Sequence, residues 1–303
     1  MDPLIIEVAI NGGTPKSRNP NVPLMPDEIA SDVLECLDAG ASVFHSHIET
    51  FDLYGKLAAD RYAEGYRKIV AKRPDAILYA TGVNAPSLEE RCTHTELLAD
   101  AGLTRMAFID PGSCNFGTAG ERGMPGANSW IYANPYNEIE YYFNMMREKK
   151  LGPGISIYEP NFLRTTLVYE RAGVLPQGAF VKFYMAGDYN FMDGTKTYQF
   201  WGLPATPTGV AAYREMMILA GSKLPWAVTV MGGDVTATGL SKLAIEQGGH
   251  IRLGLEDFCG ERQPRNIELV EEVVALARKA GRPLATSDEA AELLNLPRKT
   301  GKS

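Results

Sequence analysis

Short apolar segments alternate with longer amphipathic segments along almost the whole chain. The apolar segments are rich in β-branched residues, which is typical of buried strands. Eight such segments are present, at residues 4–10, 41–47, 76–80, 104–109, 154–158, 179–185, 226–230 and 250–255. Between them, apolar residues recur at helical spacing; after Pro26, for example, Ile29, Val33 and Leu37 fall on one helical face. This alternation predicts parallel strands joined by helical crossovers.

Glycines mark the ends of several predicted helices. The dipeptides Ala39-Gly40, Ala101-Gly102, Ala172-Gly173, Ala220-Gly221 and Gly248-Gly249 each precede a predicted strand. Glycine suits this place because it adopts the left-handed conformation that commonly ends a helix. Eight repeated units favour a closed (β/α)₈ TIM barrel over an open sheet, and no G-x-G-x-x-G follows the first strand. We expect one barrel domain over residues 1–303, with a tail at 291–303 that frays or docks on a neighbour.

Composition and charge narrow the functional classes. Hydrophobic residues make up 45% of the 303 residues and charged residues 22%, enough apolar material for a large core. The net charge of −7, without a basic run, argues against a nucleic-acid partner. The first apolar segment lacks the basic start of a secretion signal, no window is long enough to span a bilayer, and the four cysteines form no CxxC pair. These features predict a cytoplasmic protein with reduced thiols and no membrane contact.

His45 and His47 end the second predicted strand. Side chains alternate along a strand, so the two imidazoles project from the same face and can meet one cation. They are two of only four histidines in the chain; His94 falls within a predicted helix and His250 begins the last strand. The alternative is that both are polar side chains satisfied at the end of a strand.

Two adjacent acids, Glu256 and Asp257, follow the last predicted strand. All strand ends of a closed barrel meet at one mouth, so Glu256 is a candidate third ligand of a catalytic zinc site. The alternative is a pair of acids at the start of the following helix, stabilised by its dipole. Arg252 shares the alternation of Glu256 and is expected to point inward, either toward a substrate carboxylate or into an ion pair of the barrel core.

Other polar residues lie near the predicted strand ends. Small hydroxyl and amide side chains at a barrel mouth suit the binding of a carboxylate or carbonyl oxygen, although turn formation is the simpler explanation for each. The candidates for substrate binding are Asn11, Thr14, Thr81, Ser113 and Glu159. Two long connections, 110–136 and 187–207, leave from the same end and suit lids, substrate walls or subunit contacts.

Several blocks of the sequence together resemble the β-keto acid cleavage enzymes. They are V-A-I-N-G-G at 8–13, P-L-M-P-D-E-I-A at 23–30, A-G-A-S-V-F-H-S-H at 39–47, G-S-C-N-F at 112–116, W-A-V at 226–228 and, most specifically, G-G-H-I-R-L-G-L-E-D at 248–257. The resemblance implies an oligomeric (β/α)₈ barrel, a dimer or tetramer, that holds zinc through His45, His47 and Glu256.

The resemblance also implies a reaction. Family members exchange a β-keto acid and acetyl-CoA into acetoacetate and the CoA thioester of the remaining acyl fragment. Arg252 and Asp257 match the residues that handle the substrate α-proton, Ser113 matches a hydroxyl residue that contacts the substrate or thioester, and Thr81 is a candidate for holding the substrate carboxylate. Acetyl-CoA as co-substrate rests on this resemblance alone.

One departure concerns the acyl end of the substrate. Some members carry an acid shortly after the first strand, suited to an amino-bearing substrate, whereas this chain reads Gly12-Gly13-Thr14-Pro15. The main rival function is an amidohydrolase-like zinc hydrolase, which usually requires further histidines on later strands. A non-catalytic barrel that binds a metabolite is a second alternative.

Overall fold

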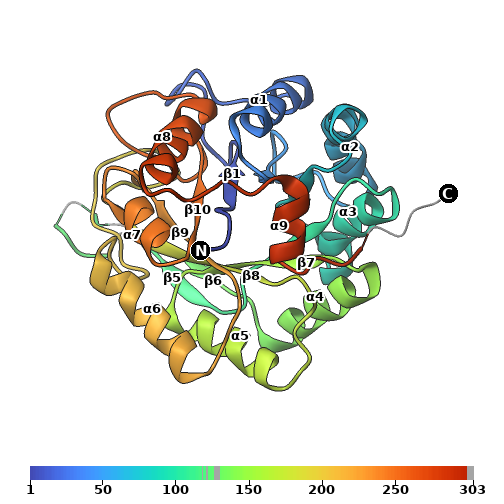
Figure 1. Ribbon diagram of the computed structural model, residues 1–303. Coiled ribbons are helices and arrows are strands. Elements are labelled where there is room, and N and C mark those ends of the chain that lie inside the picture. The colour runs from blue at the N-terminus through green and yellow to red at the C-terminus, as the bar shows by residue number, and fades with distance from the viewer. Residues whose placement is uncertain (118, 121, 126–129, 299–303) are drawn as a thin grey trace.

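Eight parallel strands form a nearly closed barrel, which confirms the predicted (β/α)₈ class (Figure 1). The computed structural model describes residues 1–117, 119–120, 122–125 and 130–298. The strands of the barrel are β1 (Ile6–Ala9), β2 (Val43–Ser46), β3 (Ile77–Ala80), β4 (Met106–Ile109), β7 (Gly152–Ile157), β8 (Phe180–Ala186), β9 (Trp226–Met231) and β10 (His250–Leu253). Their order is β3-β2-β1-β10-β9-β8-β7-β4. Each of the eight segments predicted from the sequence therefore contains, or largely overlaps, a barrel strand.

The open seam lies between β3 and β4. It is bridged at its lower end by a backbone hydrogen bond from Arg105 N to Leu78 O, at 3.1 Å. The hydroxyl of Thr104 donates to the same carbonyl, at 2.6 Å. The barrel is thus closed near the amino ends of the two strands.

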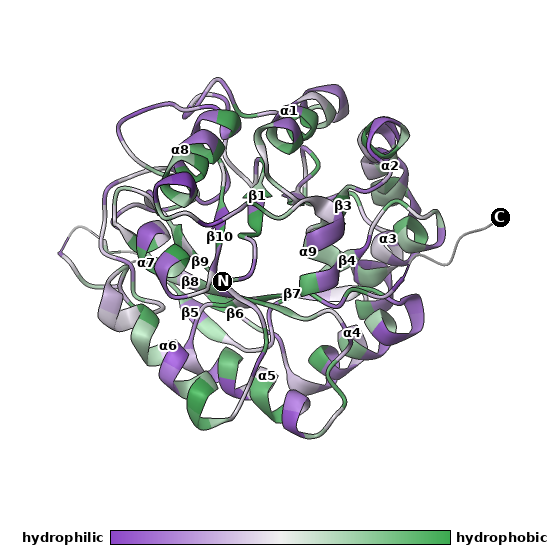
Figure 2. Ribbon diagram, viewed as in Figure 1, coloured by the Kyte–Doolittle hydropathy of each residue, from purple (hydrophilic) through white to green (hydrophobic). Residues whose placement is uncertain are grey.

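A ring of helices surrounds the barrel (Figure 1). They are α1 (Pro26–Ala39), α2 (Gly55–Lys72), α3 (Leu88–Asp100), α4 (Tyr136–Lys149), α5 (Pro160–Arg171), α6 (Pro207–Leu219), α7 (Leu240–Glu246) and α8 (Asn266–Lys279), followed by a short α9 (Ser287–Leu293). Hydrophobic and hydrophilic residues are mixed on the same helices, as Figure 2 shows. In α1, the predicted apolar face of Ile29, Val33 and Leu37 is buried. No helix in the described part of the chain is long and apolar enough to cross a membrane.

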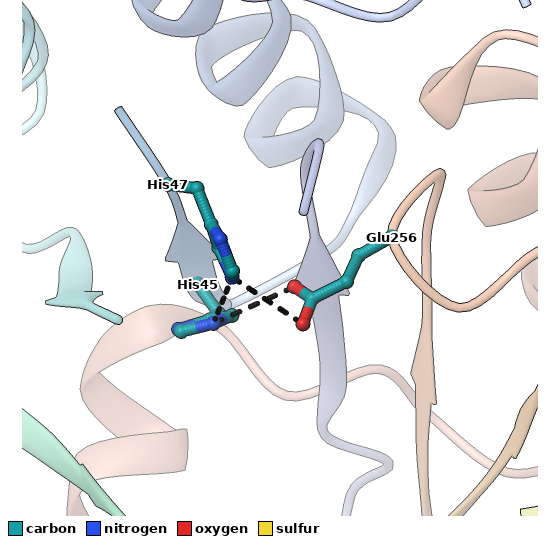
Figure 3. Close-up of side chains that lie close together, drawn as sticks. All are labelled: His45, His47 and Glu256. Atoms are coloured by element: carbon teal, nitrogen blue, oxygen red, sulfur yellow. Dashed lines mark hydrogen bonds and ion pairs between the residues drawn. The ribbon is translucent and has the colours of Figure 1, made fainter. Parts of the chain in front are cut away.

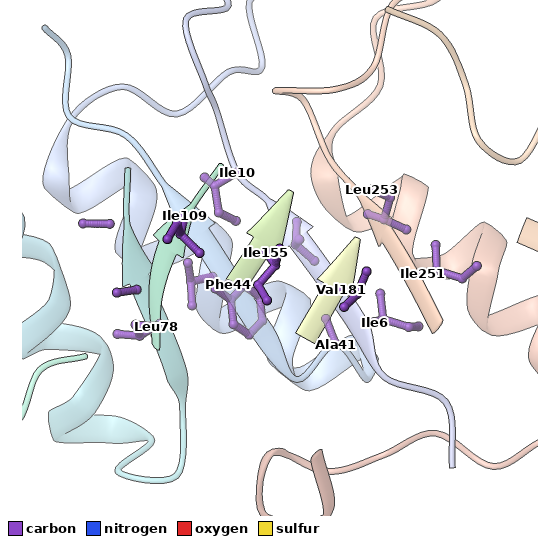
Figure 4. Close-up of a cluster of buried hydrophobic side chains, with 14 of the residues drawn as sticks. Ile6, Ile10, Ala41, Phe44, Leu78, Ile109, Ile155, Val181, Ile251 and Leu253 are labelled. Atoms are coloured by element: carbon purple, nitrogen blue, oxygen red, sulfur yellow. The ribbon is translucent and has the colours of Figure 1, made fainter. Parts of the chain in front are cut away.

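The outward faces of the strands form the main hydrophobic core. Side chains from many strands, including Ile6, Phe44, Ile155 and Leu253, are buried there together with helix residues (Figure 4). At about 25 cal/mol for each Å² of apolar surface removed from water, this layer is the main source of stability. The inward faces are thereby free to carry other chemistry.

The interior of the barrel changes character from bottom to top. Its floor is apolar and is built from Ile5, Val43, Ile77, Met106, Phe180 and Ala227. Above the floor lie three fully buried charged side chains, those of Glu7, Lys182 and Arg252. The polar mouth follows, at the carboxyl ends of the strands, where active sites of such barrels lie.

The C-terminal segment closes the floor. Helix α9 lies at the centre of the ring in Figure 1, and Ala290, Leu294 and Leu296 pack against the floor residues. The predicted tail at 291–303 is therefore docked on its own barrel as far as Leu296, because these leucines cover apolar side chains that would otherwise face water. Residues 299–303 lie outside the described residues.

The two long connections both rise from the mouth. The first contains an antiparallel hairpin of β5 (Cys114–Phe116) and β6 (Trp130–Tyr132). The second lies against it: Ala119 N donates to Tyr198 O at 3.2 Å, and Phe200 N to Gly117 O at 3.1 Å. The described residues between 111 and 136, together with residues 187–207, form a cover beside the mouth and are called the lid from here on.

Truncating Leu294, which packs against the floor, should destabilise the whole barrel. Leu294 is 2% exposed, so Leu294→Ala removes buried methyl groups and leaves a cavity, at a cost of about 2–5 kcal/mol. Leu219→Ala is the matched control because Leu219 is 80% exposed, and its effect should stay within about 0.5 kcal/mol. Urea unfolding of the two variants measures both values; equal stabilities would show that α9 does not hold the floor.

Candidate active site

His45 and His47 lie where β2 meets the mouth, and their imidazoles face the same point. Their Nε2 atoms are 3.2 Å apart, as the shared strand face predicted. The side chain of Asn11, at the end of β1, holds the backbone of His47 from both sides: Oδ1 accepts from His47 N at 2.8 Å and Nδ2 donates to His47 O at 3.0 Å. The second histidine is therefore fixed through its own backbone.

Glu256 reaches the same point from the other side of β1. The last strand ends at Leu253, so Glu256 and Asp257 stand on a turn and strand alternation does not set their directions. Gly254 makes this turn with φ of +133°, and a Cβ there would meet Ala9 O at 2.1 Å. Gly12 makes room beside it, because a Cβ on Gly12 would lie 2.4 Å from Glu256 Cγ. Neither acid begins a helix; α8 starts only at Asn266.

The three side chains converge, as Figure 3 shows. Glu256 Oε2 lies 3.5 Å from His45 Nε2, and Oε1 lies 3.4 Å from His47 Nε2. One ligand atom from each residue falls within 4.8 Å of the others, which is compatible with a shared metal ion. Burial lowers the pKa of His45 well below its usual value, so its imidazole is neutral. Burial opposes ionisation of Glu256, but the positive charge of Arg252 and a hydrogen bond from His47 hold its pKa well below the usual range.

Arg252 connects this group to the interior of the barrel. Its guanidinium binds Asp257 through two hydrogen bonds, Nε to Oδ2 at 2.9 Å and Nη2 to Oδ1 at 3.1 Å. It also donates to Glu7 Oε1 at 2.8 Å and lies 3.2 Å from Glu256 Oε1. The predicted core ion pair is thus present, and Arg252 additionally lines the cavity above it.

A cavity of about 570 Å³ opens above the three converging side chains. Charged side chains of Arg252, Glu256 and Lys182 lie in its wall. Much of the remaining wall is aromatic or apolar and comes from both the strands and the lid, including Phe51, Tyr79, Phe108, Phe116, Ile131, Tyr132, Tyr142, Tyr158, Tyr184, Phe191 and Met192. The lid therefore supplies part of the binding surface.

The residues predicted to bind substrate divide into two groups. Thr81 lines the cavity. Asn11 and Thr14 are buried, and neither belongs to the described residues that line the cavity. Thr14 Oγ1 donates to Leu255 O at 2.8 Å. Asn11 and Thr14 thus hold the backbone that carries His47 and Glu256, respectively.

Ser113 and Glu159 also have internal partners. The hydroxyl of Ser113 accepts from Asn134 N at 2.8 Å, which ties the return of the hairpin to its start. Glu159 Oε1 accepts from Gly202 N at 2.8 Å and anchors the second long connection. In this structure both residues hold the lid, and neither is among the described residues of the cavity wall.

Several charged or polar residues of the site escaped the sequence analysis, among them Glu7, Lys182 and Asp110. Glu7 lies in the middle of β1, where Tyr79 donates to Oε1 at 2.5 Å, and Lys182 Nζ donates to Tyr79 Oη at 2.7 Å. The signal was present: each charge interrupts an otherwise apolar strand, at an inward position. Asp110 follows β4 and also lines the cavity.

The two remaining histidines are structural. His94 Nε2 pairs with Thr81 O at 2.8 Å, and His250 Nδ1 accepts from Ile5 N at 3.0 Å. Both are buried. Neither belongs to the converging group, so the site holds two of the four histidines of the chain.

Comparison with known proteins adds a family to this geometry. The sequence profile of the beta-keto acid cleavage enzymes matches residues 3–296. A relative in Acetoanaerobium sticklandii, a 3-keto-5-aminohexanoate cleavage enzyme, is 30% identical over 98% of this chain and 99% of its own length. A 3-oxoadipate:acetyl-CoA acetyltransferase of Cupriavidus necator is 28% identical over 97% of this chain and 95% of its own.

A solved structure supports the fold independently. The apo structure of ObcA covers 93% of this chain and 67% of its own, with a TM-score of 0.66 at 15% identity. At that identity the likeness concerns the barrel alone. The family match, in contrast, runs from the first strand to the leucines of the floor and includes both histidines and the Glu256 turn. The chain therefore belongs to the beta-keto acid cleavage enzyme family.

Proposed function

We propose that this protein is a zinc-dependent enzyme that cleaves a β-keto acid with acetyl-CoA, giving acetoacetate and the CoA thioester of the remaining acyl fragment. One observation carries the proposal: two imidazoles and a carboxylate converge beside a buried arginine at the mouth of a barrel of this family. The relatives named above act on 3-keto-5-aminohexanoate and, with acetyl-CoA, on 3-oxoadipate.

His45, His47 and Glu256 fit a zinc ion. Their donor set of two imidazole nitrogens and one carboxylate oxygen is typical of catalytic zinc, with a position left for substrate. Magnesium prefers ligand sets made of oxygen atoms alone, whereas two of the three ligand atoms in this group are nitrogens. A bound zinc ion would supply positive charge that stabilises an enolate.

Arg252 and Asp257 are assigned to the proton transfer at the substrate α-carbon. Arg252 faces the cavity, whereas Asp257 is 2% exposed and lies behind the guanidinium, with Thr229 Oγ1 donating to it at 2.6 Å. Asp257 therefore acts through Arg252 and sets its position and charge. Thr81, in the cavity wall, is the candidate for the substrate carboxylate.

The exchange balances without water. Transfer of a C2 proton to the Arg252–Asp257 pair gives the enolate, which attacks the thioester carbonyl of acetyl-CoA and expels the CoA thiolate. The thiolate then attacks the original keto carbon, the C2–C3 bond breaks, and return of the proton from the same pair to C2 releases acetoacetate beside the new acyl-CoA. Hydrolysis is the less favoured alternative, because His94 and His250 are bound elsewhere and cannot complete the larger histidine set of an amidohydrolase.

Zinc content tests the ligand assignment. The purified protein should carry about one zinc per chain, and the double variant His45→Ala/His47→Ala should carry almost none because one carboxylate remains. His94→Gln is the matched control, since it changes a buried histidine outside the group and should keep its zinc. Full zinc in a folded double variant, measured by elemental analysis, would contradict the assignment.

Omitting acetyl-CoA tests the reaction class. The β-keto acid should disappear only when acetyl-CoA is present, because the enolate needs an acyl acceptor. Mass spectrometry should then detect acetoacetate and one new acyl-CoA in equal amounts. Equal consumption of the acid without any thioester would favour the hydrolase instead.

Isosteric changes separate the two adjacent acids. Glu256→Gln removes the charge of a ligand and should lower both zinc content and turnover. Asp257→Asn should keep zinc and fold but lower kcat by a factor on the order of 10² to 10⁴, the usual contribution of acid–base catalysis. Zinc content, KM and kcat are measured for both variants; loss of zinc in Asp257→Asn with retention in Glu256→Gln would reverse the two roles.

A further inference from the structure

Asp110 is a buried acid in the cavity wall to which the proposed reaction assigns no role. It directly follows β4, is 8% exposed and lines the cavity together with Phe108 and Ile109. In the strand order β4 stands opposite to β10, which leads to Glu256, and two strands away from β2, and no contact joins Asp110 to the described atoms of His45, His47 or Glu256. Its position is therefore suited to a part of the substrate away from the reacting carbons.

The two oxygens of Asp110 differ in their hydrogen-bond geometry. Oδ2 accepts a hydrogen bond from the hydroxyl of Tyr132 on the lid, whereas Oδ1 has no hydrogen-bond partner among the described residues. Leaving a buried acceptor without a partner is unfavourable, and more so when the acceptor is charged. A bound molecule that offers a donor at this point removes that cost.

The neighbouring groups do not meet this need. The ammonium group of Lys182, whose charge acts to lower the pKa of Asp110, donates to Tyr79 Oη at 2.7 Å and lies 3.4 Å from Glu7 Oε1. Arg252 is bound to Glu7 and Asp257. Burial raises the pKa of Asp110, while hydrogen bonding by Tyr132 and Ser156 acts to lower it; Oδ1 nevertheless has no partner in hydrogen-bond geometry among the described residues.

The residues around Asp110 bear on which acyl chains can bind beside its carboxylate. Phe108 and Ile109, which precede Asp110, offer no side-chain donor, whereas Ser156 of the neighbouring strand β7 and Tyr158 just after it bring hydroxyl groups to the same cavity. A plain hydrocarbon chain that fills this space would seal the carboxylate away from water without pairing it. A chain with a suitably placed donor pairs it instead.

We propose that Asp110 selects β-keto acids whose acyl chain carries a hydrogen-bond donor, a hydroxyl or an ammonium group, through its unpaired Oδ1. This inference rests on the proposed function and adds the substrate class. It also replaces the missing acid after the first strand: the acid that faces the acyl chain comes from the end of β4 rather than from the Gly12-Gly13 segment.

Matched substrates and variants test this selection. The substrates are 3-oxohexanoate and its derivatives with a hydroxyl or an amino group on carbon 5 or carbon 6. For each, kcat/KM is measured with acetyl-CoA, and the dissociation constant is measured without it. The natural protein should favour at least one donor-bearing acid by about 10-fold to 100-fold, the value of one hydrogen bond to a charged group.

Two variants at Asp110 separate charge from hydrogen bonding. Asp110→Asn keeps an acceptor, so preference for a hydroxyl should persist while preference for an ammonium group falls about 10-fold or more. Asp110→Leu removes the acceptor and should bring the ratio between donor-bearing and plain acids to about one. Tyr132→Phe is the control: it removes the bond to the lid but leaves Oδ1, so it should change all substrates by the same factor.

The outcomes are distinct. Tighter binding and faster turnover of plain 3-oxohexanoate than of every derivative would overturn the inference, as would equal losses on all substrates in Asp110→Leu and Tyr132→Phe, which would make Asp110 a lid anchor only. Absence of acetyl-CoA-dependent exchange would overturn the proposed function instead. In that case the dissociation constants still decide the inference, because they require no turnover.

Discussion

The guanidinium of Arg252 organises the polar interior of the barrel. A charge taken fully out of water is tolerated only when it is paired and hydrogen-bonded, and Arg252 meets Glu7, Asp257 and Glu256 at once. The same bonds that satisfy the arginine also fix Glu256 opposite the two histidines. The geometry of the candidate metal site is thus a consequence of how one buried cation is neutralised.

The barrel separates stability from chemistry along its axis. Apolar side chains fill the floor, α9 seals it, and the outward strand faces pack on the helices, so the free energy of folding comes mostly from these regions. The mouth carries buried charges and unsatisfied atoms that contribute little to stability or oppose it. This division is usual for the fold, whose carboxyl-end loops vary while the scaffold stays constant.

Polar residues at the mouth have two structural roles. Asn11 and Thr14 hold the backbones that carry His47 and Glu256, and Ser113 and Glu159 hold the lid. Such residues resemble substrate ligands in a sequence because both roles need small polar groups at strand ends. Tyr132 connects the lid to the cavity wall, since its hydroxyl donates a hydrogen bond to Asp110.

The sequence by itself determined the eight strands, the helices between them and the His45/His47 pair, because these depend on local periodicity and on the alternation of side chains along one strand. It also identified Glu256, Asp257 and Arg252 as candidates, because all three lie in or directly after the last predicted strand, whose end belongs to the barrel mouth. The partners of Arg252, the docking of α9 and the unpaired oxygen of Asp110 were decided only by the tertiary structure. They join segments as distant as Glu7 and Arg252, and closure of the barrel, rather than any local pattern, brings such segments within hydrogen-bond distance.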